Sequence, residues 1–418
     1  MIQRKHFKRS ALALAIGMTI AGGALAQSSV GSVFGNAEPS AKVTIENTQT
    51  GFRREVMADG EGRFNVSQLA PGTYKVTSGS STQNVIVRVG TGSSVDLAKV
   101  TELEAMEVLG STINPIDISS VESSTILTEQ RIDAIAVPRS VTNVALLAPG
   151  TVRGDNRFGN LASIGGASVA ENAYFVNGFN VTNIVTGLAF SQIPFEAISE
   201  QQVKTGGYGA EFGRSLGGVV NIVTKRGTND WKFGGNVFWS PGSLNDNDRF
   251  AYDPDVDGSY SVETSGETDS LVYNLYASGP IVEDKLFLFA LFQGSKVDND
   301  LEYEGGGDFI TTDTPQGLVK LDWNITDNHV VELTAFSDKT ETDAASYLRS
   351  DQEIGPGDSL SGLYGSERGG DNFVGRWTGY LTDSFTLSAL YGVGQYSRGS
   401  YDTTSQNCPI IRDRRSSI

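Results

Sequence analysis

The stretch that decides the fold runs from Gly206 to Lys225 and reads GGYGAEFGRSLGGVVNIVTK. A glycine-rich run can cradle phosphate when it lies between a strand and a helix, or when Lys-Ser/Thr follows its last glycine. Here the residues after the last glycine, Val219 to Thr224, are mostly β-branched and predict a strand. This context argues against a nucleotide-binding loop, and the glycines indicate turns and close backbone packing instead.

The same stretch closely resembles the end of the plug domain of TonB-dependent outer-membrane receptors. In that family a glycine-rich segment leads into Gly-Gly-Val-Val-Asn-Ile-x-Thr-Lys and then into the first barrel strand, and residues 217–225 match this pattern. Residues 207–214 resemble the Oar-like subgroup, whereas Lys204-Thr205-Gly206 departs from the Arg-Gly-Pro of many members. By this resemblance the plug motif comprises Gly206, Gly207, Glu211, Gly213, Arg214, Gly217, Gly218, Asn221 and Lys225.

The resemblance assigns residues 112–228 to a mixed α/β plug domain. Within it the pattern predicts short helices at 127–132 and 141–147, the second ended by Pro149-Gly150. Strands are predicted at 164–167 and 173–178, and Asn177-Gly178 is typical of a two-residue hairpin turn. We therefore expect a small sheet whose last strand leads into the barrel.

Upstream, residues 27–100 alternate between apolar and polar side chains, with turn residues every 8–12 positions. This spacing predicts a small β-sandwich. The segment also resembles the carboxypeptidase regulatory-like domain, which Oar-like receptors carry before the plug. The matching features are residues 31–35, the alternation at 41–45, Asp59-x-x-Gly62-x-Phe64 and Leu69-x-Pro71-Gly72-x-Tyr74-x-Val76. The resemblance implies a binding or spacer module without catalysis.

The first 26 residues have the pattern of a secretory signal peptide. A basic start is followed by the apolar run Ala11 to Ile20 and by Ala24-Leu25-Ala26, so cleavage is expected between Ala26 and Gln27. The run is too short to cross a bilayer as a helix, which needs about 20 apolar residues. We expect an exported protein of a Gram-negative outer membrane.

Residues 101–111 form the connection between sandwich and plug. By the resemblance, its central part is the candidate TonB box, the segment that pairs with TonB of the inner-membrane complex. The candidate residues are Leu103, Glu104, Ala105, Met106, Glu107, Val108 and Leu109. Strand addition to an exposed sheet edge is a recurrent mode of such pairing. A plain linker or a short helix is the alternative reading of these residues.

From residue 229 to 418, apolar and polar residues alternate in segments of about ten, which is the signature of a transmembrane β-barrel. We count seven strands. Inward polar positions include Lys320 and Asp322, opposed by Val319, Leu321 and Trp323 on the lipid-facing side. Residues 285–294 are apolar at both faces, so the pattern does not assign their orientation. The predicted fold is mainly β: a sandwich, a mixed α/β plug and the first part of an incomplete antiparallel barrel.

The connections between these strands alternate between long and short, as in outer-membrane barrels, with long ones of about 29, 18 and 31 residues. The first long connection is acidic. Within it Asp253, Asp255, Asp257 and Gly258 match the opening of a calcium-binding loop, but Thr264 stands where the closing glutamate belongs. Calcium is therefore a candidate ligand, with a solvated acidic loop as the alternative, and no other cofactor is expected.

Composition narrows the function classes. The chain of 418 residues has a net charge of −17, one cysteine and two histidines, which argues against nucleic-acid binding, disulfide frameworks and histidine-rich metal centres. The resemblance to TonB-dependent receptors implies no enzyme but a plug-gated outer-membrane transporter for an unidentified substrate, with outer-membrane lipid around it. The alternative is a surface adhesin or structural β-protein. Because seven strands are odd and few, we also expect the chain to be an incomplete copy of a larger receptor.

Overall fold

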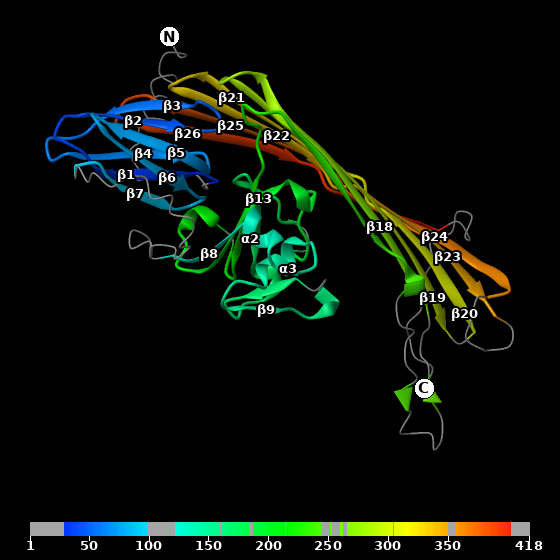
Figure 1. Cartoon of the computed structure of the whole chain (residues 1–418). Coiled ribbons are helices and arrows are strands. Elements are labelled where there is room, and N and C mark those ends of the chain that lie inside the picture. The colour runs from blue at the N-terminus through cyan, green and yellow to red at the C-terminus, as the bar shows by residue number, and fades with distance from the viewer. Residues whose placement is uncertain are drawn as a thin grey trace, which may run out of the picture.

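The computed structural model describes residues 29–98, 122–158, 161–183, 187–213, 215–244, 251–252, 260–261, 266–303, 305–349 and 357–402. It contains a small sandwich, a mixed domain and a long curved sheet (Figure 1). The sandwich lies at one end of the long sheet, and the mixed domain lies beneath its curve. No helix within these residues has the length and apolar character needed to cross a membrane.

The sandwich has seven strands in two sheets, of order β4-β1-β7 and β3-β2-β5-β6. Its core forms because alternate residues point inward: Val43 and Ile45 of β2 are fully buried, as is Val76 of β5. The expected sandwich is confirmed. Its strands are β1 (Gly31–Asn36), β2 (Lys42–Asn47), β3 (Arg53–Met57), β4 (Arg63–Leu69), β5 (Gly72–Ser78), β6 (Ser81–Val87) and β7 (Gly92–Asp96).

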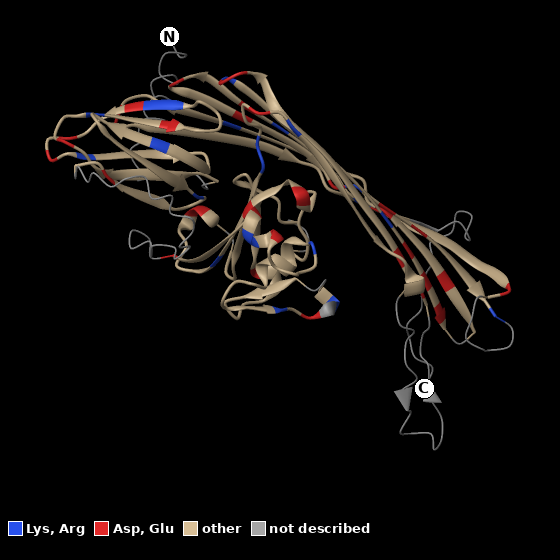
Figure 2. Cartoon of the chain, viewed as in Figure 1, with Lys and Arg blue, Asp and Glu red and all other residues tan. Residues whose placement is uncertain are grey.

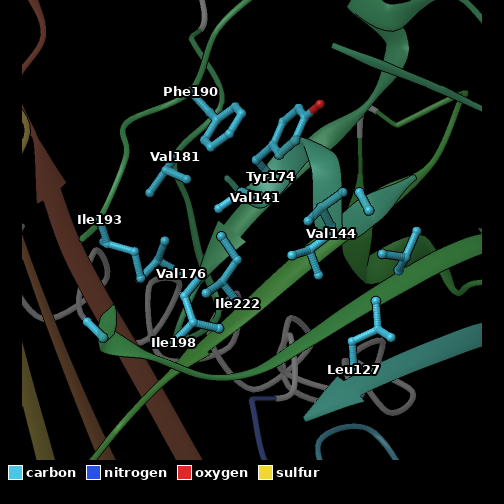
Figure 3. Close-up of a cluster of buried hydrophobic side chains, with 14 of the residues drawn as sticks. Leu127, Val141, Val144, Tyr174, Val176, Val181, Phe190, Ile193, Ile198 and Ile222 are labelled. Carbon is cyan, nitrogen blue, oxygen red and sulfur yellow. The ribbon is translucent and has the colours of Figure 1, made fainter. Parts of the chain in front are cut away.

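The plug domain is built on a five-stranded sheet of order β12-β11-β14-β13-β8. Its strands are β8 (Ser123–Thr128), β11 (Ala173–Val176), β12 (Phe179–Asn180), β13 (Ile198–Gly206) and β14 (Val219–Thr224); β9 (Thr151–Arg153) pairs separately with β10 (Ala162–Ile164). The helices are α2 (Glu129–Asp133) and α3 (Val141–Ala145). Leu127, Val144, Tyr174, Val176 and Ile222 are among the side chains that meet in its core (Figure 3).

Two local predictions for the plug need correction. The helix expected from residue 127 begins at Glu129, because Leu127 and Thr128 end β8, which pairs with β13. The strand expected at 164–167 ends at Ile164, because Gly165 and Gly166 adopt φ of 65° and 80° and turn the chain. The hairpin turn at Asn177-Gly178 is confirmed, since both residues have the positive φ of a type I′ turn.

The long sheet is antiparallel and consists of eleven segments, most of them paired in chain order. They are β15 (Lys232–Ser240), β18 (Thr268–Val282), β19 (Leu286–Tyr303), β20 (Gly306–Asp313), β21 (Gln316–Thr326), β22 (His329–Ser337), β23 (Thr340–Leu348), β24 (Ser359–Gly369), β25 (Asp371–Tyr380), β26 (Thr386–Gly394) and β27 (Ser397–Asp402). Two residue pairs, β16 (Ala251–Tyr252) and β17 (Tyr260–Ser261), lie within the first long connection.

The eleven segments make seven barrel strands, as expected. β19 pairs with β21 over one half of its length and with β20 over the other, so β20 and β21 are one interrupted strand. By the same pairing β22 continues into β23, β24 into β25 and β26 into β27. In the described part of the chain β15 and β26 each have one neighbour, so this sheet is open.

The expected connection of about 18 residues between the third and fourth strands is wrong. Those residues extend β19 and form β20, and the chain reverses tightly between Tyr303 and Gly306. The segment was not recognised as strand because its polar residues carry no apolar alternation. Likewise, most of the connection of about 31 residues is the hairpin of β23 and β24. Acidic residues are concentrated at this end of the sheet (Figure 2).

The two faces of the sheet differ as the alternation predicts. Lys320 and Asp322 are buried on the inner face, and Val319 and Trp323 are exposed on the outer face. The structure also orients residues 285–294: Phe287, Phe289 and Leu291 are buried, the last two within the core of the plug. Both faces of this segment are apolar because one meets the plug core. The exposed outer face also carries Phe233, Val237, Trp239, Leu275, Phe373 and Tyr391.

Candidate functional site

The plug motif forms the turn that leads into β14. Tyr208 donates a hydrogen bond to Gly217 O at 2.7 Å, and Ser215 donates to Gly218 O at 2.8 Å. Asn172 accepts from Gly218 N at 2.9 Å and donates to Ala162 O at 2.6 Å. The backbone of the glycine-rich segment is therefore hydrogen-bonded to the preceding loop at Asn172. These hydrogen bonds require the two segments to pack closely against each other.

Two kinds of glycine occur in the motif. Gly207 and Gly213 adopt φ of 72° and 57°, in the left-handed region that glycine enters without cost. Gly218 is constrained by space instead, since a β-carbon there would lie 2.3 Å from Ile164 Cγ2 and 2.5 Å from Ile164 Cβ. A β-carbon at Gly206, the last residue of β13, would meet nothing within 4 Å.

We expect Gly218→Ala to destabilise the plug by about 1–3 kcal/mol, because the added methyl group must displace the buried Ile164. Gly206→Ala is the matched control, since its methyl group has open space. The measurement is the urea midpoint of plug unfolding in the purified chain. Equal midpoints for the two variants would contradict the packing argument.

The remaining motif residues do not converge on one point. Asn221 is buried in the centre of the plug sheet, between Gln202 of β13 and Phe175 of β11. Lys225 forms an ion pair with Glu129 of α2 at 2.7 Å. Glu211 lies in a short 3-10 helix, Ala210–Phe212. These residues shape the plug and do not assemble a catalytic or ligand pocket.

The Asn177-Gly178 turn fastens the plug to the barrel wall. The Asn177 side chain donates to Thr224 Oγ1 at 2.8 Å and to Thr334 Oγ1 on β22 at 3.0 Å. Arg376 on β25 donates to the Asn177 carbonyl at 2.8 Å. Next to the turn, Phe179 packs against Gly392 on β26, where a β-carbon would lie 2.4 Å from its ring. One plug turn thus contacts three barrel strands.

A buried group of charges lies where the plug joins the barrel. Arg226, just after β14, lies 2.6 Å from Glu332 and 3.6 Å from Asp322. Glu332 also lies 3.7 Å from Arg376 and 3.9 Å from Lys320. We call these five residues the junction cluster: Arg226, Lys320, Asp322, Glu332 and Arg376. It holds three cations and two anions, so each carboxylate is needed to balance buried positive charge.

A second contact between plug and barrel uses Asp338, at the break between β22 and β23. One carboxylate oxygen accepts from Gln192 N of the plug at 2.8 Å, and the other accepts from Gly370 N at 3.0 Å. The strand break therefore positions an acceptor for the plug.

Several sequence-predicted sites lie outside the described residues. They are the cleavage site at Ala26 and Gln27, the candidate TonB box at Leu103 to Leu109, Arg214 of the plug motif, and the calcium candidates Asp253, Asp255 and Asp257. Among the described residues, no group of three or more His, Cys, Asp or Glu side chains is arranged to hold a metal ion.

Sequence reasoning did not identify the junction cluster as a site. The strand pattern places Lys320 and Asp322 on the inward face but does not mark them as a site, and it assigns no role to Arg226. The available signal was charge at inward positions of neighbouring strands, because a charge that faces a plug core needs a partner. Their mutual distances depend on strand pairing and could not be read from one strand.

Comparison with known proteins gives two family matches. The carboxypeptidase regulatory-like domain matches residues 29–101, and the TonB-dependent receptor plug domain matches residues 114–219. The TonB-dependent transporter Oar of Myxococcus xanthus is 30% identical over an alignment of 345 residues, and the match covers 73% of this chain and 31% of Oar. The chain thus spans about a third of the length of this curated relative.

Similar solved structures include the outer membrane transporter YddB of Escherichia coli. It is 14% identical, with a TM-score of 0.41, and the match covers 67% of this chain and 44% of YddB. Another is Pseudomonas aeruginosa FpvA bound to pyoverdines, at 14% identity and a TM-score of 0.39, covering 67% and 43% of the two chains.

The matched proteins are transporters and receptors and not enzymes, and they belong to the outer membrane. This chain thus has a carboxypeptidase regulatory-like domain followed by a TonB-dependent receptor plug domain, and it is similar to the TonB-dependent transporter Oar.

Proposed function

We propose that the protein takes up a substrate across the outer membrane through a barrel that the plug closes, with energy delivered by TonB. The observation that carries this proposal is the two-sided sheet. Its inner face contributes Phe289, Leu291, Leu318 and Phe336 to the plug core, while its outer face exposes aromatic and aliphatic side chains. A soluble protein would not present such a face to water, so lipid is its expected neighbour.

The proposal includes three finer points that rest on the sequence. The chain would be exported with cleavage between Ala26 and Gln27, and it would supply the sandwich, the plug and the first strands of a larger barrel. TonB would bind residues 103–109 by strand addition.

Substrate accumulation tests the transport function. Cells with and without TonB, each carrying or lacking this receptor, are given labelled peptides, oligosaccharides and metal chelates. We expect one class to accumulate only when both TonB and the receptor are present. If no class does so, and the receptor instead promotes cell contact regardless of TonB, the protein is an adhesin.

Calcium binding by the acidic connection remains a separate proposal. Asp253, Asp255 and Asp257 offer oxygen ligands at alternate positions, as in calcium loops. We expect titration of the purified protein with calcium to release heat that Asp255→Ala removes. Asp248→Ala, in the same acidic connection, is the control that keeps the binding heat. An unchanged titration for Asp255→Ala would exclude this site.

A further inference from the structure

The sandwich is docked on the end of the barrel sheet where the short turns lie. Its anchor is Arg54 on β3, whose side chain is only 8% exposed. The guanidinium donates to Asn328 Oδ1 and, at 3.1 Å, to Thr382 O, and it lies 3.6 Å from Asp383. Asn328 is in the β21–β22 turn, and the other two residues are in the β25–β26 turn. One sandwich residue therefore ties two barrel hairpins together.

Tyr380, at the end of β25, strengthens the dock from the barrel side. It is 4% exposed and packs within the sandwich core, with its ring centroid 6.0 Å from that of Phe52. Its hydroxyl donates to Gln68 O at 2.9 Å, and Arg54 Cζ lies 5.2 Å from its ring centroid. A barrel side chain thus completes the core of the sandwich, as expected for a specific interface.

A third hairpin is held through Asn229, between the plug and β15. Its backbone N–H donates to Gln49 O of the sandwich at 2.9 Å. Its side chain donates to Asp284 Oδ1 at 2.6 Å and accepts from Asp284 N at 2.9 Å, in the β18–β19 turn. Two hairpins of the barrel therefore contact the sandwich directly, and the third contacts Asn229, which is hydrogen-bonded to the sandwich.

The same sandwich also binds the plug. Val89 donates its N–H to Glu200 on β13 at 2.9 Å and accepts from Gln202 Nε2 at 3.4 Å. Its side chain forms a buried cluster with Ile126 on β8 and Val223 on β14. Burial raises the pKa of Glu200, against the effect of the Val89 hydrogen bond. Three plug strands are thus held by one loop of the sandwich.

The position of β8 gives these contacts a mechanical consequence. β8 is the edge strand of the plug sheet, paired only with β13 in the described part of the chain. The connection that contains residues 103–109 joins the sandwich to β8. A pulling force applied to this connection would therefore act on the sandwich at one end and on β8 at the other. Because Ile126 packs on Val89, separating β8 from β13 while the sandwich stays docked would also break this buried cluster.

We propose that the sandwich is an intramolecular clamp, which bridges the barrel turns and the plug and keeps β8 on its sheet until the clamp is released. The surface that receives it consists of the turns at Asp284, Asn328 and Asp383. The use of this clamp in gating rests on the proposed transport function, whereas the restraint on β8 does not.

Hydrogen exchange of the intact purified receptor tests the clamp without TonB or substrate. Arg54→Glu reverses the charge that faces Asp383, and we expect amide exchange in residues 49–57 and in β8 to rise roughly tenfold or more. Arg53→Glu is the matched control. Arg53 is exposed and pairs only locally with Glu55 at 2.6 Å, so exchange in β8 should stay unchanged. Arg54→Glu with Asp383→Arg should restore slow exchange.

A covalent version addresses the possibility that Arg54→Glu simply disturbs folding. A β-carbon added at Gly51 would lie 3.2 Å from Asp284 Cβ, slightly less than the separation of about 3.5–4.5 Å in a disulfide. In an Arg54→Glu, Cys408→Ser background, Gly51→Cys with Asp284→Cys should return β8 to slow exchange when oxidised and to fast exchange when reduced. Both positions have positive φ, so the single cysteine variants are the controls.

Faster exchange in residues 49–57 without any change in β8 would overturn the proposal, because the sandwich would then be released without freeing the plug. No change in either segment for Arg54→Glu would also overturn it, since Arg54 would not be the anchor. Neither result bears on transport, which the TonB-dependent accumulation assay tests separately.

Discussion

Replacing Glu332 with alanine is expected to lower the free energy of unfolding by about 3–5 kcal/mol. Glu332 is the carboxylate nearest to Arg226, and it lies within 4 Å of Lys320 and Arg376 as well. Its loss leaves the three cations of the junction cluster with one carboxylate of that cluster, Asp322. An unbalanced buried charge costs more than the pair contributed, because water cannot replace the missing carboxylate.

The measurement is the urea midpoint of the purified receptor, followed by protection of the plug from protease. Glu283→Ala is the control, since this glutamate is exposed in the β18–β19 turn. A Glu332→Ala midpoint equal to that of the control would show that the junction cluster does not hold plug and barrel together.

The second large effect is expected in the candidate TonB box. Met106→Pro or Val108→Pro should abolish binding to TonB, because proline removes a backbone donor and restricts φ, and strand addition depends on main-chain hydrogen bonds. Met106→Ala is the matched control, since it shortens the side chain and keeps the donor. Both proline variants should still reach the outer membrane in normal amount.

Cross-linking in cells measures this effect. A photoreactive residue at position 103 should form a product with TonB in the parent and in Met106→Ala, and none in Met106→Pro. Normal cross-linking by both proline variants would place the TonB box elsewhere in the chain.

Much of the architecture could be predicted because it follows from local pattern. The strand Val219–Thr224 and the turn at Asn177-Gly178 depend on β-branched residues and on an Asn-Gly pair, and both occur where expected. The inward position of Lys320 and Asp322 follows from the period of two in a strand. Such features need only the residues that form them.

The rest depends on contacts between distant residues. Phe289 faces the plug core, but its strand is apolar on both sides, so alternation could not orient it. The extension of β19 beyond Gln293 is polar, and no burial pattern marks it as strand. Arg54 and Thr382 are 328 positions apart, and no feature of either segment predicts the contact between them. The contact between the sandwich and the barrel turns therefore could not be predicted from the sequence.

If TonB opens the plug, Val203 should become accessible to a water-soluble reagent. Val203 lies on β13 between β8 and β14 and is fully buried. Val203→Cys, in a Cys408→Ser background, is labelled with a thiol reagent in energised cells with and without TonB. We expect labelling several-fold faster with TonB, and we expect Met106→Pro to remove this difference. Equal labelling rates with and without TonB would contradict this expectation.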